Sequence, residues 1–224
     1  MPRFFVGTDQ ISDKNIVITG TDVNHIRNVL RMAPGEEVTV SDGQGMDYFC
    51  KIAELTKEEV RLDIIDSWHS FVELPAKIYL FQGLPKADKM ELIIQKAVEL
   101  GVYEIVPVAT KRAVVKLDAK KEEKKRLRWQ SIAESAAKQA GRALIPQVAP
   151  CMNFDKALRM CNGLDAALIP YEKAEGMQHA RDQVRALHGK HSIGIFIGPE
   201  GGFEESEIEA ARGAGAVPIT LGHR

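Results

Sequence analysis

Apolar and polar residues alternate with the period of β-strands through most of the first 73 residues. The short runs with this pattern, separated by turn-forming residues, cover residues 4–6, 16–18, 37–41, 46–53 and 60–66. Between two of these runs lies the tetrapeptide Asp42-Gly43-Gln44-Gly45, whose glycines can adopt the positive φ angles of a tight hairpin. The pattern predicts a small all-β domain, either a barrel or a sandwich.

One helix is predicted inside this β-rich part of the chain. Thr21 can cap its N-terminus, and Val23, Ile26, Val29 and Leu30 follow at helical spacing. We expect these four apolar side chains to form one face of the helix.

From Leu74 onward the period changes to alternating strands and helices. Strands are predicted at residues 78–82, 103–108, 165–169, 193–197 and 217–221, and helices at 88–100, 122–140, 154–160, 178–187 and 204–212. Such alternation is typical of an α/β fold, a mostly parallel sheet with helices on its faces. We therefore predict two domains, residues 1–73 and 74–224.

Composition and the start of the chain indicate a cytoplasmic protein without a membrane partner. The hydrophobic fraction of 45% and the charged fraction of 27% are ordinary for a globular protein. No apolar run approaches the roughly 18 residues that a membrane span needs, and the residues after Met1 lack the apolar stretch of a secretory signal.

Neither the cysteines nor the histidines define a metal site. Cys50, Cys151 and Cys161 are an odd number without a CxxC pair, which argues against a disulfide framework and a cysteine zinc site. We expect them to be buried thiols. His188 and His191 lie three residues apart, but no third ligand follows in a recognisable pattern, so no bound metal is predicted.

Charge is distributed unevenly along a chain whose net charge is only -1. Residues 1–72 carry 7 basic and 12 acidic side chains, whereas residues 111–142 carry 11 basic and 4 acidic ones. Basic side chains neutralise phosphates, so the second segment is a candidate RNA contact. A mixed run of this kind is more often a solvated helix face, and we expect Trp129 within it to lie in the core.

A glycine-rich loop follows the predicted strand at residues 193–197. It reads Gly198-Pro199-Glu200-Gly201-Gly202 and leads into a predicted helix. Ligands of α/β sheets bind beyond the carboxyl ends of strands, and glycine lets the backbone approach a ligand closely. The loop matches neither GxGxxG nor a P-loop, so a phosphate cradle fits poorly. A tight turn without a ligand accounts for the spacing equally well.

A polar helix face is predicted in the segment after Gly83. Lys89, Lys96 and Glu99 lie on it, with i,i+3 spacing between the last two. Without further information, this is a solvated face with local ion pairing.

Together these blocks resemble the RsmE-type methyltransferases of small-subunit ribosomal RNA, members of the SPOUT superfamily. The resemblance covers nearly the whole chain, and the Gly-Pro-Glu-Gly-Gly block is highly specific to the family. The other matching residues are 3–5, 29–31, 86–91, 95–101, 133–142, Glu207 and 221–224.

The resemblance implies methylation of uridine N3 in 16S ribosomal RNA with S-adenosylmethionine as the cofactor. It also implies a PUA-like RNA-binding β-barrel over residues 1–73 and a knotted SPOUT domain over residues 74–224, in a homodimer whose active site forms at the subunit interface. In the family, the block that matches residues 221–224 continues into a segment that threads the knot and completes the cofactor pocket. These 224 residues do not include that segment, and we expect a complete knot, full cofactor affinity and activity to need it.

The resemblance also assigns site residues. The cofactor loops are residues 168–172, 198–202 and 221–224, and the cofactor-binding residues within them are Leu168, Pro170, Gly198, Pro199, Glu200, Gly201, Gly202, Leu221 and Gly222. Candidate RNA contacts are Arg31, Lys86, Lys89, Arg128 and Arg142. Because the N3 proton of uridine must leave, we expect Arg142 or Arg224 to stabilise the resulting anion. The general base is not identified.

Three alternatives remain open at this stage. Another SPOUT methyltransferase would act on transfer RNA. A non-catalytic RNA-binding protein would bind RNA in a salt-sensitive way without binding the cofactor. An α/β nucleotide-binding enzyme would bind ATP or NAD at the glycine-rich loop.

Overall fold

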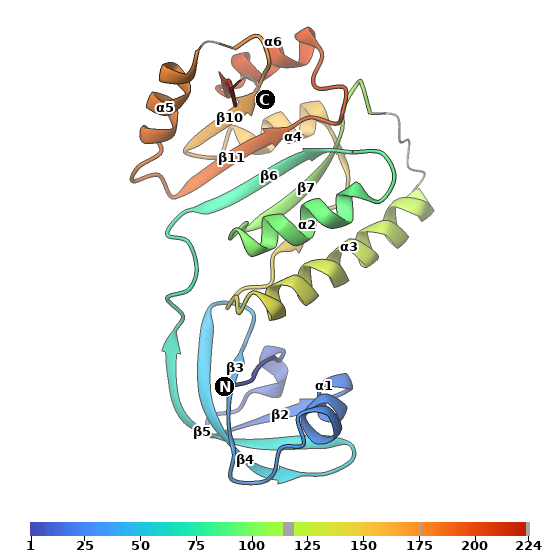
Figure 1. The fold of residues 1–224 in the computed structure, drawn as a ribbon, viewed down its shortest axis with the longest axis vertical. Helices are drawn as coiled ribbons and strands as arrows, with labels where there is room; N and C mark the ends of the chain where they lie inside the picture. Colours follow the sequence, from blue (N-terminus) through green and yellow to red (C-terminus); the bar gives the residue numbers. More distant parts are fainter. Residues whose placement is uncertain (114–118, 175, 223–224) are drawn as a thin grey trace. The chain divides into compact units, whose positions relative to one another are not determined.

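The computed structural model describes residues 1–113, 119–174 and 176–222 (Figure 1). The chain divides into two units, Met1–Glu73 with Ala137–Ile145 and Leu74–Ala136 with Pro146–Arg224. Periodicity gives no sign that residues 137–145 join the first unit. They do so through long-range hydrogen bonds, in which Ser41 Oγ donates to the carbonyl of Ala143 and the amide of Ile145 donates to the carbonyl of Gly43.

The first unit is built on a five-stranded sheet that curls into a half-barrel (Figure 1). The strand order is β1 (Arg3–Phe5), β3 (Glu37–Ser41), β4 (Met46–Leu55), β5 (Glu59–His69) and β2 (Asn15–Thr19). All neighbours are antiparallel except β1 and β3. The predicted hairpin between β3 and β4 is confirmed, because Asp42 Oδ1 accepts hydrogen bonds from the amides of Gln44 and Met46 and both turn glycines have positive φ.

The predicted helix exists, but its cap and half of its apolar face were wrong. Gly20, with φ 75°, occupies the N-cap position of α1 (Thr21–Asn24), and no side chain caps the helix. Val23 and Ile26 are buried, whereas Val29 is 64% exposed and Leu30 39%. The cause is a wide π-helical turn, η2 (His25–Val29), in which the amide of Leu30 donates to the carbonyl of His25. This wider turn changes the direction of the side chains that follow. A short 3₁₀ turn, η1 (Thr8–Gln10), precedes β2.

The second unit contains a parallel sheet. Its order is β12 (Val217–Ile219), β10 (Ala166–Pro170), β11 (Ser192–Ile197), β6 (Lys77–Gly83), β7 (Glu104–Ala109) and β8 (Gln147–Val148), and β9 (Met152–Asn153) also pairs with β7. Every one of these pairs is parallel, so all carboxyl ends lie at one edge. The predicted strands and helices are confirmed to within a few residues. Strands β8 and β9 were not predicted because two-residue strands carry no period.

Helices cover both faces of this sheet (Figure 1). They are α2 (Lys89–Glu99), α3 (Ala119–Gln139), α4 (Phe154–Cys161), α5 (Met177–Arg185) and α6 (Glu205–Gly213). Phe81 and Phe196 stack at the centre with their ring centroids 4.4 Å apart, and Phe154 of α4 and Ile208 of α6 belong to the same core cluster. Trp129 is 5% exposed, which confirms its predicted place in the core.

The thiols are mostly buried, as expected. Cys50 and Cys161 are buried and Cys151 is partly buried. Burial raises the pKa of Cys50 to about 12 and that of each of the other two thiols to about 11, which keeps them protonated and unreactive at neutral pH. Among the helices in the described ranges, none is both long and apolar enough to cross a membrane.

Candidate functional site

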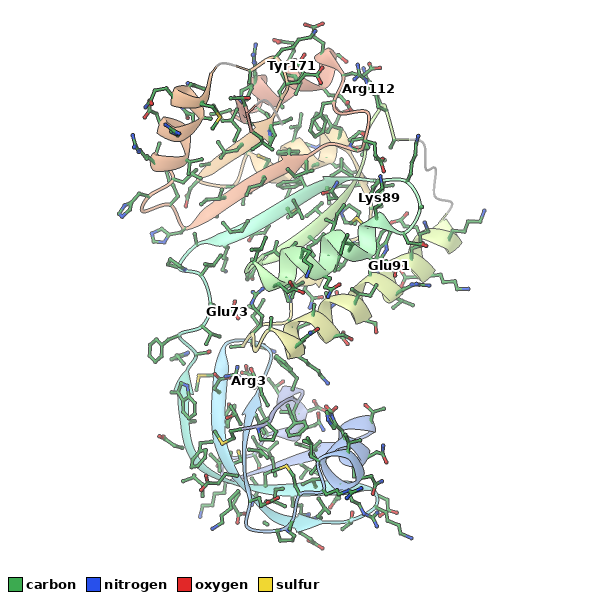
Figure 2. The ribbon with its side chains drawn as sticks, viewed as in Figure 1. Arg3, Glu73, Lys89, Glu91, Arg112 and Tyr171 are labelled. Atoms are coloured by element: carbon green, nitrogen blue, oxygen red, sulfur yellow. The ribbon has the colours of Figure 1, made fainter. Side chains whose placement is uncertain are left out.

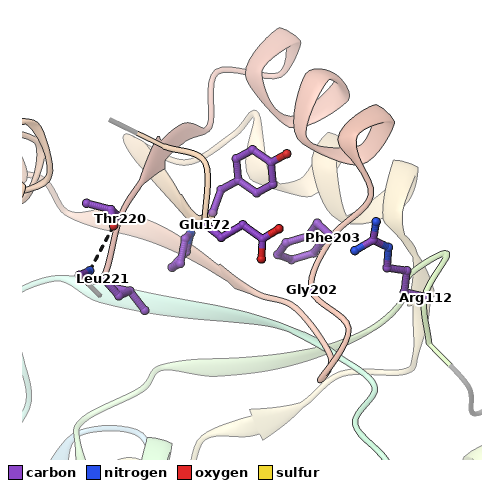
Figure 3. A pocket seen from close by; sticks show the side chains of 9 residues that line it. Arg112, Glu172, Gly202, Phe203, Thr220 and Leu221 are labelled. Atoms are coloured by element: carbon purple, nitrogen blue, oxygen red, sulfur yellow. Dashed lines mark hydrogen bonds between the residues drawn. The ribbon is translucent and has the colours of Figure 1, made fainter. Parts of the chain in front are cut away.

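One pocket lies where the carboxyl ends of neighbouring strands meet in the second unit (Figure 3). Its volume is about 240 Å³, slightly below the roughly 300 Å³ at which typical small-molecule sites begin. The segments after β10, β11 and β12 line it, together with one side chain from the loop after β7. The lining residues are Arg112, Pro170, Tyr171, Glu172, Gly202, Phe203, Thr220, Leu221 and Gly222. This edge is the position at which α/β sheets bind ligands.

Two hydrogen bonds donated by main-chain amides hold two of these segments in place. The amide of Tyr171 donates to the carbonyl of Ile219 at 2.9 Å, which joins the ends of β10 and β12. The amide of Gly222 donates to Thr220 Oγ1 at 3.1 Å, and the φ of 96° at Gly222 turns the chain there (Figure 3). The pocket wall therefore combines main-chain groups with the apolar surface of Tyr171 and of Leu221, which is largely exposed.

The glycine-rich loop after β11 forms a tight turn against its neighbours. The amide of Gly202 donates to the carbonyl of Pro199 at 2.9 Å, and Gly202 has φ 67°. A Cβ at Gly198 would lie 3.1 Å from main-chain atoms of Gly202. A Cβ on Gly83, the last residue of β6, would lie 2.7 Å from Pro199 Cδ and 2.9 Å from Pro199 N. Close backbone packing therefore requires glycine at positions 83 and 198.

Glu200 anchors this loop to the segment that begins α2. Its Oε1 accepts a hydrogen bond from Lys89 Nζ at 2.8 Å and one from the amide of Lys86 at 3.2 Å. Figure 2 labels Lys89, which begins α2. The hydrogen bond from Lys89 is the main reason that the pKa of Glu200 is lowered from 4.5 to about 2. The Glu200 carboxylate therefore links the glycine-rich loop to the segment at the start of α2.

Replacing Lys89 with methionine is expected to raise the pKa of Glu200 toward 4.5. Because the folded-state pKa is the lower one, the stabilisation from the anchor is complete above about pH 4.5 and disappears as the pH falls toward 2. Carboxyl carbon chemical shifts followed by NMR during an acid titration measure this pKa. Lys96→Met is the matched control on the same helix, since Lys96 pairs with Glu99. An unchanged Glu200 titration in the Lys89 variant would show that the anchor is absent in solution.

Two further side chains brace the loop from the other side. The buried carboxylate of Glu207 accepts the amides of Lys111 and Glu204, each at 2.9 Å, and so fixes the start of α6. Arg112 Nη1 donates to the carbonyl of Gly201 at 2.7 Å. Its guanidinium lies on the pocket wall, which also contains the carboxylate of Glu172 (Figure 3).

The structure brings the three predicted cofactor loops together. Four of the nine predicted residues line the pocket: Pro170, Gly202, Leu221 and Gly222. Leu168 is buried in β10. The other four, residues 198–201, form the part of the glycine-rich loop between β11 and Gly202. Three lining residues, Arg112, Phe203 and Thr220, lie outside the predicted loops and were missed. The signal for Arg112 was its position three residues beyond the end of β7, at the same sheet edge.

The predicted RNA and catalytic residues belong to both units. Arg31 is exposed in the first unit with φ 55°, and Lys86 and Lys89 lie at the start of α2. Arg128 on α3 pairs with Glu91 at 2.7 Å. Arg142, 5% exposed, pairs with Glu73 at 2.6 Å within the first unit. Arg224 lies outside the described residues. The roles of these side chains stay predictions.

A curled sheet followed by a parallel sheet with three convergent loops is the fold of the SPOUT class of RNA methyltransferases, and the comparisons with known proteins assign the chain to that class. Residues 72–224 match the model of the RNA methyltransferase domain, and residues 18–65 match that of the RNA methyltransferase PUA domain. The chain belongs to this RNA methyltransferase family.

Individual relatives are similar over almost their whole length. The chain is 37% identical to ribosomal RNA small subunit methyltransferase E of Bacillus subtilis, covering 100% of this chain and 90% of the relative. The structure of the Neisseria gonorrhoeae ribosomal RNA small subunit methyltransferase E bound to S-adenosyl methionine is 33% identical, with a TM-score of 0.85 over 100% of this chain and 90% of that one. A Legionella pneumophila structure in complex with the cofactor SAM is 29% identical, with a TM-score of 0.81 over 99% and 89%.

Proposed function

We propose that this protein transfers the methyl group of S-adenosylmethionine to N3 of a uridine in the 16S RNA of the small ribosomal subunit. The observation that carries the proposal is the convergence of three loops on one pocket at the carboxyl edge of the sheet. The relatives named above support the cofactor and the RNA, since two are named for the small-subunit RNA and two were solved with the cofactor.

The pocket residues fit this cofactor. Glycine at position 202 leaves the main chain accessible, and Tyr171, Phe203 and Leu221 offer apolar surface for an adenosine. Arg112 and Glu172 provide a cation and an anion on one wall, which suit the carboxylate and ammonium of the methionine end. When bound, S-adenosylmethionine supplies a methyl group activated by a positively charged sulfonium.

The protein's own contribution is to position the two reactants and to stabilise charge. The uridine must lose its N3 proton, and a nearby guanidinium stabilises the anion that results. We assign this role to Arg224 or Arg142, each of which lies close to a glycine in the sequence.

Alanine at position 224 is expected to lower kcat by roughly a hundred-fold, because removing one charge-stabilising group typically costs that much. Affinity for the cofactor should change far less. Steady-state kinetics with RNA, combined with calorimetric binding of S-adenosylhomocysteine, separate the two effects. Arg185→Ala, which removes an exposed guanidinium on α5, is the control. Unchanged turnover in both the Arg224 and the Arg142 alanine variants would overturn the assignment.

The remaining parts of the proposal concern RNA and assembly. The PUA-like unit and the basic residues Arg31, Lys86, Lys89, Arg128 and Arg142 contact the RNA. The active protein is a homodimer with a knotted second domain, and it acts in the cytoplasm. Sedimentation of the protein with and without RNA tests the dimer.

The reaction itself is tested by incubating the chain with S-adenosylmethionine and 16S RNA and then analysing the nucleosides by mass spectrometry. The proposal predicts 3-methyluridine in the RNA. Methylation of transfer RNA instead would identify another SPOUT activity. Salt-sensitive RNA binding without any methyl transfer would favour a non-catalytic role.

A further inference from the structure

Another hollow lies in the second unit, apart from the pocket at the ends of β10, β11 and β12. It has a volume of about 310 Å³ and lies between the start of α2 and the first half of α3. Glu91 on α2, which Figure 2 labels, contributes to its wall, and the side chains from α3 are Lys121, Lys124, Lys125, Arg128 and Trp129. None of its lining residues lines the pocket at the ends of β10, β11 and β12.

The hollow carries a net positive charge. Four basic side chains line it against two acidic ones, Asp88 and Glu91. Glu91 is already paired with Arg128. Among the described residues, no carboxylate lies within ion-pair distance of Lys124 or Lys125. Two ammonium groups are therefore left for an anion.

The floor of the hollow is mostly apolar. Trp129, which is 5% exposed, is among the lining residues, and the Lys125 ammonium lies 6.0 Å from the centroid of its ring. The methylene stems of the lysines add apolar surface while their charges stay at the rim. A simple inorganic anion would leave the floor uncovered, and an apolar peptide would leave the ammonium groups unpaired. A nucleotide, with a flat base and a phosphate, satisfies both.

The surroundings favour a polymer over a free nucleotide. Basic residues continue along the chain beyond the hollow, with 11 basic against 4 acidic side chains over residues 111–142. A repeated positive charge matches the repeated phosphates of a strand, and single-stranded RNA binds to basic surfaces that also offer aromatic side chains.

We propose that this hollow binds one nucleotide of a single-stranded segment of the substrate RNA, with its phosphate against Lys124 and Lys125. The inference rests on the proposed function, because that function supplies the RNA. It deepens that function, because Arg128, already proposed as an RNA contact, lines the hollow, and the inference adds Lys124, Lys125 and a site for one nucleotide apart from the reacting uridine.

Tryptophan fluorescence gives a local readout of binding. The chain has two tryptophans, so Trp68→Phe leaves Trp129 as the sole emitter. Titrating this full-length variant with an oligouridylate of about eight nucleotides should quench the emission in a saturable way. Adding Lys124→Glu and Lys125→Glu should weaken binding roughly ten-fold and reduce the salt dependence by about two counterions. The control is Lys156→Glu with Lys190→Glu, which changes two exposed lysines elsewhere in the same unit. It should leave the affinity for the oligouridylate and the salt dependence of that affinity unchanged.

Each alternative outcome has one meaning. Equal oligouridylate affinity in the Lys124 and Lys125 variant, or the absence of quenching, overturns the inference. Saturation by uridine monophosphate at the same concentration as the oligouridylate identifies a free nucleotide as the occupant and also overturns it; inorganic phosphate is the further control. If the protein methylates 16S RNA but its Trp129 emission is not quenched by the oligouridylate, only this inference is refuted. Quenching without methylation refutes only the proposed function.

Discussion

Replacing Gly83 with alanine is expected to weaken binding of S-adenosylmethionine by roughly ten-fold or more. The new Cβ would lie 2.7 Å from Pro199 Cδ and 2.9 Å from Pro199 N, distances that force the glycine-rich loop to move. Overpacking of this kind costs about 1 to 3 kcal/mol, and about 1.4 kcal/mol corresponds to a ten-fold change in affinity. The displaced turn contains Gly202, which lines the pocket, so the cost falls on the cofactor site. Isothermal calorimetry measures the affinity.

Gly163→Ala, in the same unit, is the matched control for this experiment. A Cβ at that position meets only the carbonyl oxygen of Met160, at the ordinary contact distance of 3.6 Å, and Gly163 does not line the pocket. The cofactor affinity of this variant should stay within about two-fold of the wild type, which corresponds to less than 1 kcal/mol. Urea unfolding of both variants separates a local shift from a loss of folding. Equal affinities for the Gly83 and Gly163 variants would contradict the proposed role of the close approach to Pro199.

Arg142→Ala is expected to lower the free energy of unfolding by about 2 to 4 kcal/mol. Arg142 is almost fully buried and pairs with Glu73, whose side chain is 22% exposed. Glu73 also accepts the amides of Ala143 and Leu144, so the pair fastens residues 137–145 within the first unit. Removing the guanidinium leaves a carboxylate with less than its full set of partners, which is why the loss is larger than for a surface pair. Urea denaturation followed by circular dichroism measures it.

The control is Arg61→Ala in the same unit. Arg61 also pairs with a glutamate, Glu59, at 2.9 Å, but both side chains are substantially exposed, and such pairs contribute about 0 to 1 kcal/mol. Equal losses for the two variants would show that burial of the Arg142 pair has no energetic effect. Arg142 is also a proposed catalytic and RNA-binding residue, so turnover of its alanine variant is interpretable only with the folded fraction measured in the same sample.

Much of the fold could be predicted because it depends on short-range patterns. The alternation of strand and helix periods from Leu74 onward predicted the parallel sheet, and Asp42 with its neighbouring glycines predicted the hairpin. A family-specific block then located the glycine-rich loop. Because the sheet is parallel, a loop after one strand implied neighbours at the ends of the adjacent strands.

Long-range partners could not be predicted in the same way. Lys89 and Glu200 are 111 positions apart, and each alone is an ordinary charged residue. Arg112 was missed because an arginine after a strand is typical of a solvated loop, and only the fold places it on the pocket wall. The helix predicted at residues 21–30 exists, but half of its predicted apolar face was wrong for a local reason, since its π-helical turn has no sequence signal and exposes Val29.

The most direct test of the central claim is a calorimetric titration of this 224-residue chain with S-adenosylmethionine, S-adenosylhomocysteine and ATP. Both cofactor forms should bind at one site per chain, ATP should not compete, and Gly83→Ala should weaken the binding. Preferential binding of ATP, or the absence of binding by either cofactor form both to this chain and to one that also carries the family segment after residue 224, would contradict the assignment of the pocket at the ends of β10, β11 and β12 as the methyl-donor site.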